Sequence, residues 1–234
     1  MNFDKVWTAD NFTRLMVGDL LLRGEIGGLL LTLVIGFIAI FAATLLGATL
    51  GMMRASRLAI FRLPAILYIQ TVRNVPLLIL IFWAYLVPPY LGVETSKFSS
   101  VTVALTLFTT AYIAEFIRGG IRSVPFGHIE AGRALGLSPM QIQLWIVLPQ
   151  AFFNMIPAIT GRYVVSIKNT SLAFLIGLAD LTEIGKQIAG RLMSSPIEIY
   201  LTLLMIYFVV NRGISASTRM LEHRPRFNRL FLRM

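Results

Sequence analysis

The sequence predicts an all-α integral membrane protein with five transmembrane helices, an outside N-terminus and a cytoplasmic C-terminus. Composition is the first observation: 56% of the 234 residues are hydrophobic, 14% are charged, and the mean hydropathy is +0.76. These values lie outside the soluble globular range. The second observation is a set of long apolar runs. The third is that basic residues gather at the ends of these runs, as they do beside membrane spans.

The composition also excludes several classes of protein. The chain contains no cysteine, so it has neither disulfides nor a thiolate metal site. Its formal net charge is +10, which by itself would suit a nucleic-acid-binding protein. However, the basic residues flank apolar runs instead of forming a stripe, so we expect membrane lipid as a partner and no nucleic acid.

Residues 1–25 are expected to form an N-terminal interfacial segment. They mix acidic and basic residues with apolar ones such as Trp7 and Phe12. A secretory signal would have a basic start and a short apolar core, so this segment is not one. The pattern favours an amphipathic helix at the membrane surface, with a loosely ordered tail as the alternative.

A transmembrane domain is predicted over 26–217, and its first span covers 26–53. This run carries no charge and exceeds the roughly 20 apolar residues that cross a bilayer. Gly36, Gly47 and Gly51 would let another helix approach closely.

Three arginines follow the first span and place the next loop in the cytoplasm, by the positive-inside rule. A membrane-edge helix at 64–71 then leads to the second span, expected at 74–93. The third span, at 99–117, runs inward and ends near Glu115 and Arg118. Their three-residue spacing favours a structural ion pair over a gating role.

The remaining spans are expected at 151–178 and 194–217, followed by a basic cytoplasmic tail at 218–234. The fifth span has the shortest apolar run, so it needs flanking residues to cross the membrane. The six arginines from Arg212 onward place the C-terminus inside.

A polar stretch between the third and fourth spans, residues 119–150, carries unusually complete helix-capping chemistry. Gly136 suits the left-handed residue that closes a helix. Ser138, Pro139 and Gln141 then suit a capping box that opens the next helix. The spacing fits both a docking surface and a plain helical hairpin.

The same stretch resembles the EAA loop of the permease subunits of bacterial ABC importers. That pattern is Glu-Ala-Ala, then Gly after three residues, then Ile-x-Leu-Pro after nine more. The chain has these residues at Glu130, Ala131, Gly132, Gly136, Ile146, Leu148 and Pro149, with Gly132 as the one departure. The wider resemblance covers about 26–222 and is closest to polar amino acid permeases of the histidine/glutamate/arginine type.

The resemblance implies a type I ABC importer permease in the bacterial inner membrane, with a cytoplasmic coupling helix between spans 3 and 4. It implies a second permease (the same or a related chain), a periplasmic amino-acid-binding protein, and two cytoplasmic ATPase subunits that hold ATP and Mg²⁺. The residues expected to couple to the ATPases are Gly127, Glu130, Ala131, Gly132, Arg133, Leu135, Gly136, Leu137 and Ser138.

The chain itself is expected to be neither an enzyme nor a holder of cofactors. It lacks a G-x-x-x-x-G-K-[ST] phosphate loop. Its two histidines, His128 and His223, are far apart in sequence and make no metal constellation. A secondary transporter would show more spans and internal repeats, and a membrane enzyme would show clustered catalytic groups.

Arg162 is the most informative residue for the substrate, because it lies within the apolar fourth span, where the family usually has a neutral polar residue. A guanidinium binds a carboxylate bidentately, which favours glutamate or aspartate. A structural ion pair for Arg162 remains the alternative, as do basic or other polar substrates such as arginine, histidine and glutamine. The expected substrate path comprises Arg162, Ser166, Asn169, Thr170, Ser171, Glu115 and Arg73.

Overall fold

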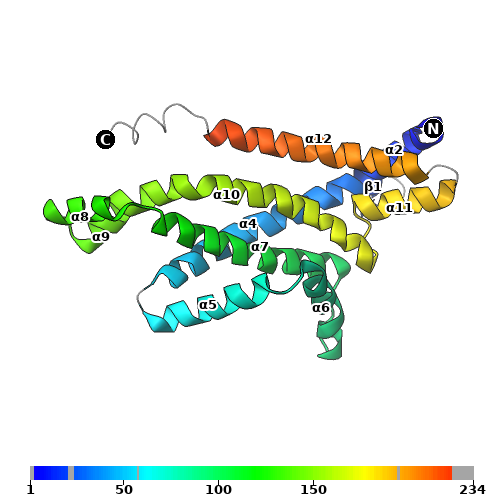
Figure 1. Ribbon diagram of the computed structural model, residues 1–234. Helices are drawn as coiled ribbons and strands as arrows, with labels where there is room; N and C mark the ends of the chain where they lie inside the picture. Colours follow the sequence, from blue (N-terminus) through cyan, green and yellow to red (C-terminus); the bar gives the residue numbers. More distant parts are fainter. Residues whose placement is uncertain (1–2, 21–23, 57, 194–195, 223–234) are drawn as a thin grey trace. The chain divides into compact units, whose positions relative to one another are not determined.

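The computed structural model describes residues 3–20, 24–56, 58–193 and 196–222 (Figure 1). The chain divides into two compact units. The first comprises Met1–Phe41, Val75–Phe108 and Val164–Ile214, and the second Ala42–Asn74, Thr109–Tyr163 and Ser215–Met234. Three long helices, α4 (Gly28–Ala55), α7 (Lys97–Arg122) and α10 (Leu148–Asn169), run through both units.

Helices make up almost all of the described structure. The others are α1 (Phe3–Val6), α2 (Ala9–Val17), α5 (Ala59–Arg73), α6 (Leu77–Tyr90), α8 (Phe126–Ala134), α9 (Pro139–Gln141), the π-helix η1 (Ile142–Val147), the 3₁₀-helix η2 (Thr170–Ile176), α11 (Leu181–Leu192) and α12 (Pro196–Glu222). One small antiparallel pair, β1 (Gly18–Asp19) with β2 (Glu25–Ile26), was not expected from the sequence. Its register pairs Gly18 with Ile26.

The second predicted span, 74–93, differs most from the structure. Among the residues that the structure describes, four helical stretches are long and apolar enough to cross a membrane, and counting α5 and α6 together as one bent span gives a fifth. Alone, the 14-residue α6 is about 21 Å long, shorter than the roughly 30 Å hydrocarbon core. The helices part at Asn74–Pro76, because proline lacks an N–H and disfavours a helical residue before it.

The fourth span begins at a different residue than expected. Helical structure continues over 38 residues from Pro139 to Ile176, so the end of the predicted coupling stretch leads into the fourth span without a break in helical structure. The candidate fifth span, Pro196–Ser217, lies within the expected 194–217, and the helix that contains it, α12, extends to Glu222. The backbone of α12 therefore includes the start of the predicted tail 218–234. The side chains of that tail, and all of 223–234, lie outside the described residues.

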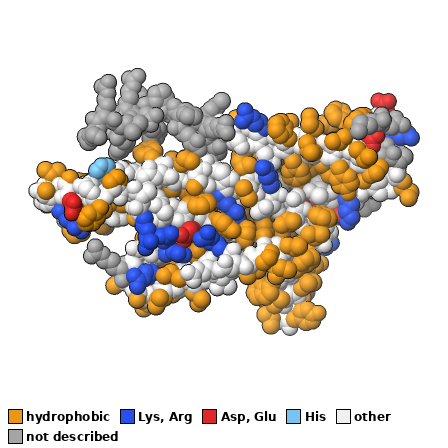
Figure 2. Space-filling model, in the orientation of Figure 1, with side chains coloured by type: hydrophobic (Ala, Val, Ile, Leu, Met, Phe, Trp, Pro, Cys, Tyr) orange, Lys and Arg blue, Asp and Glu red, His pale blue; other side chains and the backbone are white. Residues whose placement is uncertain are grey.

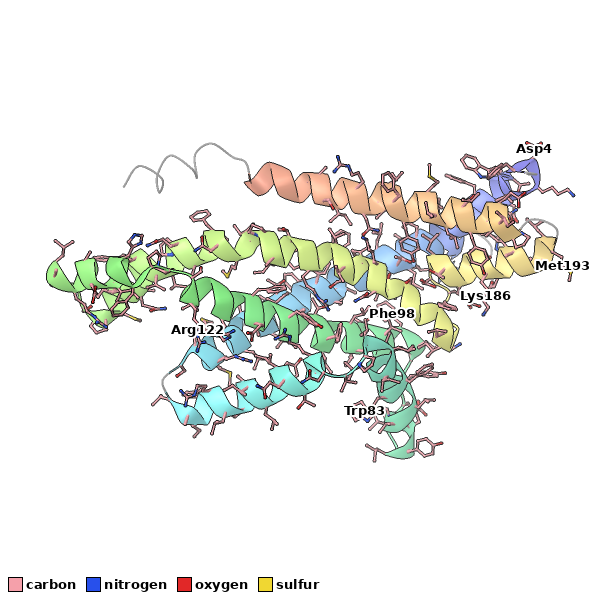
Figure 3. The ribbon with its side chains drawn as sticks, in the orientation of Figure 1. Asp4, Trp83, Phe98, Arg122, Lys186 and Met193 are labelled. Atoms are coloured by element: carbon pink, nitrogen blue, oxygen red, sulfur yellow. The ribbon has the colours of Figure 1, made fainter. Side chains whose placement is uncertain are left out.

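In the first unit, the N-terminal segment packs on α11 and α12. Val6 and Leu15 are buried against Leu181, Ile184 and the start of α12, and the Trp7 indole N–H donates to Thr202 Oγ1 at 3.2 Å. Trp7 nevertheless remains 65% exposed. Hydrophobic side chains also cover α6 (Figure 2), from which Trp83 projects outward (Figure 3). Such apolar surface is normal for helices that face lipid.

The glycines of α4 allow the close helix approach that the sequence predicts. A Cβ built on Gly36 would lie 2.3 Å from Ile167 Cδ1 of α10, within the first unit. In the second unit, a Cβ on Gly47 would lie 2.7 Å from Ile113, and one on Gly51 would lie 2.9 Å from Ile117, both on α7. A side chain at Gly47 or Gly51 would force the helices apart, because the close atoms there include Cβ atoms and backbone oxygens, whereas the end of the Ile167 side chain could turn away from one at Gly36.

Candidate coupling surface and substrate path

The glycine turn after α8 has the predicted geometry. Gly136 has a φ of 73°, the left-handed conformation. Its N–H donates to the Arg133 carbonyl at 2.9 Å, and the Leu137 N–H donates to the Gly132 carbonyl at 3.1 Å. These two bonds form a Schellman motif, which satisfies the last carbonyls of the helix.

The second helix start is also confirmed. Ser138 Oγ accepts the Gln141 backbone N–H at 3.3 Å, and Gln141 Oε1 accepts the Ser138 N–H at 2.8 Å. Pro139 occupies the first helical position. This capping box satisfies two N–H groups that would otherwise lack partners.

The chain then widens into the π-helix η1, which the sequence analysis did not predict. The Leu148 N–H donates to the Gln143 carbonyl, five residues back. Pro149 explains the wide turn, because its ring would clash with the carbonyl four residues earlier and it has no N–H to donate. Gln150 Nε2 adds a hydrogen bond to the Ile146 carbonyl at 2.8 Å.

Gly132 has a packing role that the sequence analysis missed. A Cβ at this position would lie 2.6 Å from Ile146 Cδ1 and 3.2 Å from Ile142 Cγ1. The glycine thus lets α8 lie directly against η1, as Figure 1 shows at the start of α10. Val124, Ile142, Val147 and Ala151 form the small core beneath.

The opposite face of α8 and α9 is open. Apolar side chains on it are strongly exposed: Leu135 is 79% exposed, Met140 67% and Phe126 60%. Arg133 lies over the Phe126 ring, its Cζ 5.8 Å from the ring centroid. Of the nine predicted coupling residues, Gly132 is buried, Leu137 is half-buried, and Gly127, Glu130, Ala131, Arg133, Leu135, Gly136 and Ser138 are exposed.

The second unit also gathers three arginines around one carboxylate. Arg118 donates to Glu115 Oε1 through Nε at 2.9 Å and through Nη2, which forms the predicted i,i+3 pair. The other oxygen, Glu115 Oε2, lies 3.2 Å from Arg54 Nη1 and 3.9 Å from Arg73 Nη1. Because one negative charge faces three positive ones, the group carries an excess charge of +2.

A fourth arginine joins this group through an aromatic ring. Arg162 Cζ lies 3.9 Å from the Tyr112 ring centroid, and Arg73 Cζ lies 5.2 Å from the same centroid. Both distances suit a cation–π interaction. Arg162 is only 9% exposed, whereas the Arg73 side chain is 40% exposed, so Arg73 is the accessible member of the pair.

An open groove of about 650 Å³ lies next to this group. Its walls come from the end of α7 and the first half of α10, including Glu115, Arg118, Ser123, Asn154 and Met155. The Asn154 amide donates to Ser123 Oγ at 2.8 Å.

Arg73, Glu115 and Arg162 are therefore brought together in the second unit. Ser166, Asn169, Thr170 and Ser171 belong to the first unit. Ser166 and Thr170 are buried, and the Thr170 hydroxyl donates to the Ile167 carbonyl at 2.7 Å. Helix α10 changes to the 3₁₀-helix η2 at Thr170, and the Asn169 side chain makes no cap hydrogen bond there.

Comparison with known proteins identifies the family. The family of inner membrane components of binding-protein-dependent transport systems matches residues 43–227. The chain belongs to this family. The permease is thus a multi-pass inner membrane protein and a transport component.

Its relatives are amino acid permeases. A probable glutamine ABC transporter permease of Bacillus subtilis is 34% identical and covers 84% of this chain and 91% of its own length. A glutamate/aspartate import permease of Escherichia coli O6:H1 is 33% identical, with coverage of 84% and 91%. The permease is therefore a subunit of an amino acid ABC importer.

Solved structures agree on the fold. A chain in the crystal structure of an amino acid ABC transporter with histidines has a TM-score of 0.79 and 31% identity, covering 84% of the permease and 92% of that chain. A chain of the inward-facing methionine ABC transporter has a TM-score of 0.67 and 22% identity, covering 82% and 91%. The fold is that of a type I ABC importer permease.

Several residues of the permease that take part in these sites were missed by the sequence analysis. Arg54 was read only as a marker of the cytoplasmic side, although it contacts Glu115. Tyr112 stands three residues before Glu115, a helical spacing that signals a shared face. His128 and Gln150 gave no signal, because their contact joins residues 22 positions apart.

Proposed function

We propose that the permease moves an acidic amino acid, glutamate or aspartate, from the periplasm to the cytoplasm. It works with a second permease, identical or related, and with a periplasmic binding protein that delivers the substrate. Two cytoplasmic ATPase subunits hold ATP and Mg²⁺ and supply the energy. The relative named as a glutamate/aspartate import permease supports this substrate class.

The excess of arginine over carboxylate is the observation that carries the substrate proposal. Arg54, Arg73, Arg118 and Arg162 lie around Glu115 and Tyr112. Charged groups in membrane helices normally face a partner, a cavity or the bundle interior. A substrate that carries a net negative charge would offset part of the excess, whereas a basic amino acid would add to it.

In this proposal, the accessible Arg73 meets the substrate carboxylate first, and the carboxylate then passes to the buried Arg162. The Tyr112 ring keeps both guanidinium groups on one site without neutralising them. Glutamine is the second candidate, because relatives at 34% and 32% identity are named as glutamine permeases.

The exposed apolar face of α8 and α9 supports the proposed ATPase contact. Leu135, Met140 and Phe126 present a patch beside charged residues, as expected of a surface that a partner covers. Glu130 and its neighbours would receive the movement of the ATPases. The helix that continues from Pro139 would carry that movement into the fourth span.

The test is ATP hydrolysis by the complex reconstituted in liposomes with its binding protein and a panel of amino acids. We expect glutamate or aspartate to stimulate hydrolysis, and Arg162→Gln to raise the concentration needed roughly tenfold or more. A hydrogen bond to a charged group contributes about 1.5–3 kcal/mol, which corresponds to that factor. An ionophore should leave ATP-driven uptake unchanged, unlike the uptake of a secondary transporter.

Arg122→Gln is the matched control, because Arg122 is an exposed arginine at the end of α7 (Figure 3). It should behave like the wild type. Stimulation by glutamine or a basic amino acid, unchanged in Arg162→Gln, would overturn the acidic substrate and return Arg162 to a structural role. The importer function itself would survive that outcome.

A further inference from the structure

A chain of polar contacts joins the coupling helix α8 to the start of the fourth span. His128 Nδ1 of α8 lies 2.7 Å from Gln150 Oε1 of α10. The same Gln150 side chain donates from Nε2 to the Ile146 carbonyl of η1 at 2.8 Å. One amide thus contacts α8 through its oxygen and η1 through its nitrogen.

The chemistry of the amide determines the direction of both bonds. Its NH₂ group must donate to the Ile146 carbonyl, which leaves the oxygen free to accept. His128 therefore donates from a protonated Nδ1. This arrangement exists in the Nδ1–H tautomer and in the imidazolium ion, because both carry that proton.

The location of these contacts gives them mechanical importance. The π-helical turns of η1 lie between α9 and α10, and π-helical hydrogen bonds are less favourable than α-helical ones. A movement of α8 can therefore change η1 from π-helical to α-helical turns instead of moving α10. The apolar core of Val124, Ile142 and Val147 joins the same parts, but apolar contacts are non-directional and permit sliding.

We propose that Gln150, held by His128, is a positioning residue that fixes α8 relative to the start of α10 across the π-helical turn. The hydrogen bonds prevent η1 from rewinding while α8 moves, so that the movement reaches the fourth span. This inference rests on the proposed ATPase contact of α8. It assigns the two side chains a role in the yield of transport per ATP, and none in contacting substrate or nucleotide.

The test measures the ratio of amino acid transported to ATP hydrolysed by the reconstituted complex. A ratio does not change with the amount of folded protein, so a merely structural defect leaves it unaltered. We expect His128→Ala and Gln150→Ala each to lower the ratio about fivefold, the factor for one hydrogen bond of about 1 kcal/mol. The double variant should lower the ratio no further than either single variant, since each single substitution already removes the His128–Gln150 contact.

Two further variants sharpen the result. His128→Gln should restore the ratio, because an amide can donate to Gln150 Oε1. Gln143→Ala is the matched control: it makes the same substitution on an exposed glutamine of η1 and should keep the wild-type ratio.

Unchanged ratios in both single variants, or additive losses in the double variant, would overturn the proposal. Failure of the proposed ATPase contact looks different: the wild-type complex would then show no amino-acid-stimulated hydrolysis, whereas a different substrate would leave the ratio test intact with that amino acid.

Discussion

Gly136 shows how one residue shapes the coupling surface. Its φ of 73° places the N–H groups of Gly136 and Leu137 on the last carbonyls of α8. No heavy atom lies within 4 Å of a Cβ built there, so backbone conformation and not space requires the glycine. This conclusion follows from local geometry, which is why the sequence alone predicted it.

We expect Gly136→Val to leave the permease in the membrane but to abolish coupled uptake. A β-branched residue in the left-handed region costs roughly 1–2 kcal/mol or more, enough to reshape the turn between α8 and α9. Uptake by membrane vesicles, normalised to permease content, measures this. Gly136→Asn is the control, since asparagine tolerates the conformation. Normal uptake by the valine variant would contradict the role of the turn.

Asp180 is a buried carboxyl group at the N-terminus of α11 and outside the spans. It is 0% exposed, and its Oδ1 accepts the Glu183 N–H at 2.9 Å. Burial raises the pKa of Asp180 to about 7, against the lowering effect of its hydrogen bonds with the backbone and with Thr182. Asp180 is the N-cap of α11, and its burial arises from tertiary packing, which the sequence does not show.

The raised pKa makes the stability of the permease depend on pH. Between about pH 4 and pH 7 the folded state holds a proton that the unfolded state releases, so stability falls as pH rises through this window. The full change is on the order of 4 kcal/mol. We expect Asp180→Asn to remove this decline in the thermal midpoint between pH 5 and pH 8. Asp10→Asn, at an exposed carboxylate, should retain it. An identical decline in wild type and Asp180→Asn would refute the assignment.

At the scale of elements, the approach of α4 to α7 depends on small residues. A Cβ on Gly51 would lie 2.9 Å from Ile117 Cβ and 3.1 Å from the Ala114 carbonyl oxygen. The backbone oxygen cannot rotate away as a side chain can. Arg54, one turn further along α4, reaches Glu115 of α7 only while the helices remain close.

Gly51→Val should therefore lower the stability of the purified permease by about 1–3 kcal/mol, the usual cost of overpacking. Thermal unfolding in detergent measures the change. Gly213→Val is the control, because a Cβ built at Gly213 of α12 would meet no heavy atom of a neighbouring element within 4 Å. Equal thermal unfolding midpoints for Gly51→Val and Gly213→Val would contradict the prediction, because they would show that α4 and α7 accommodate a side chain at Gly51 without loss of stability.

Elements differ in how well the sequence predicted them. The capping box at Ser138 and the turn at Gly136 were predictable, because their partners lie within a few residues. The π-helix η1 was not, although Pro149 was a local signal for it. The sequence did indicate α5 and α6 as separate elements, a membrane-edge helix at 64–71 and a span at 74–93, and the structure separates the two helices at Asn74–Pro76.

At the scale of the whole molecule, the sequence by itself determined the class of protein. Composition, charge-free runs and flanking arginines indicate which segments transfer favourably from water to lipid. The free energy of this transfer is a property of each segment by itself, so it can be read without tertiary contacts. The EAA-like stretch identified the family for the same reason, since it is one continuous segment. The predicted orientation, with the N-terminus outside, rests on the same distribution of charge.

Only the tertiary structure decided which charges meet. The sequence contains 21 basic and 11 acidic residues and its spacing indicates the Glu115–Arg118 pair, but nothing in it shows that Arg54 and Arg73 also reach Glu115. Nor does it show that Arg162 lies on Tyr112 or that His128 reaches Gln150. Most of these contacts join residues on different helices, so they form only when the helices pack. The physical reason is that local patterns specify helices, whereas packing specifies the site between them.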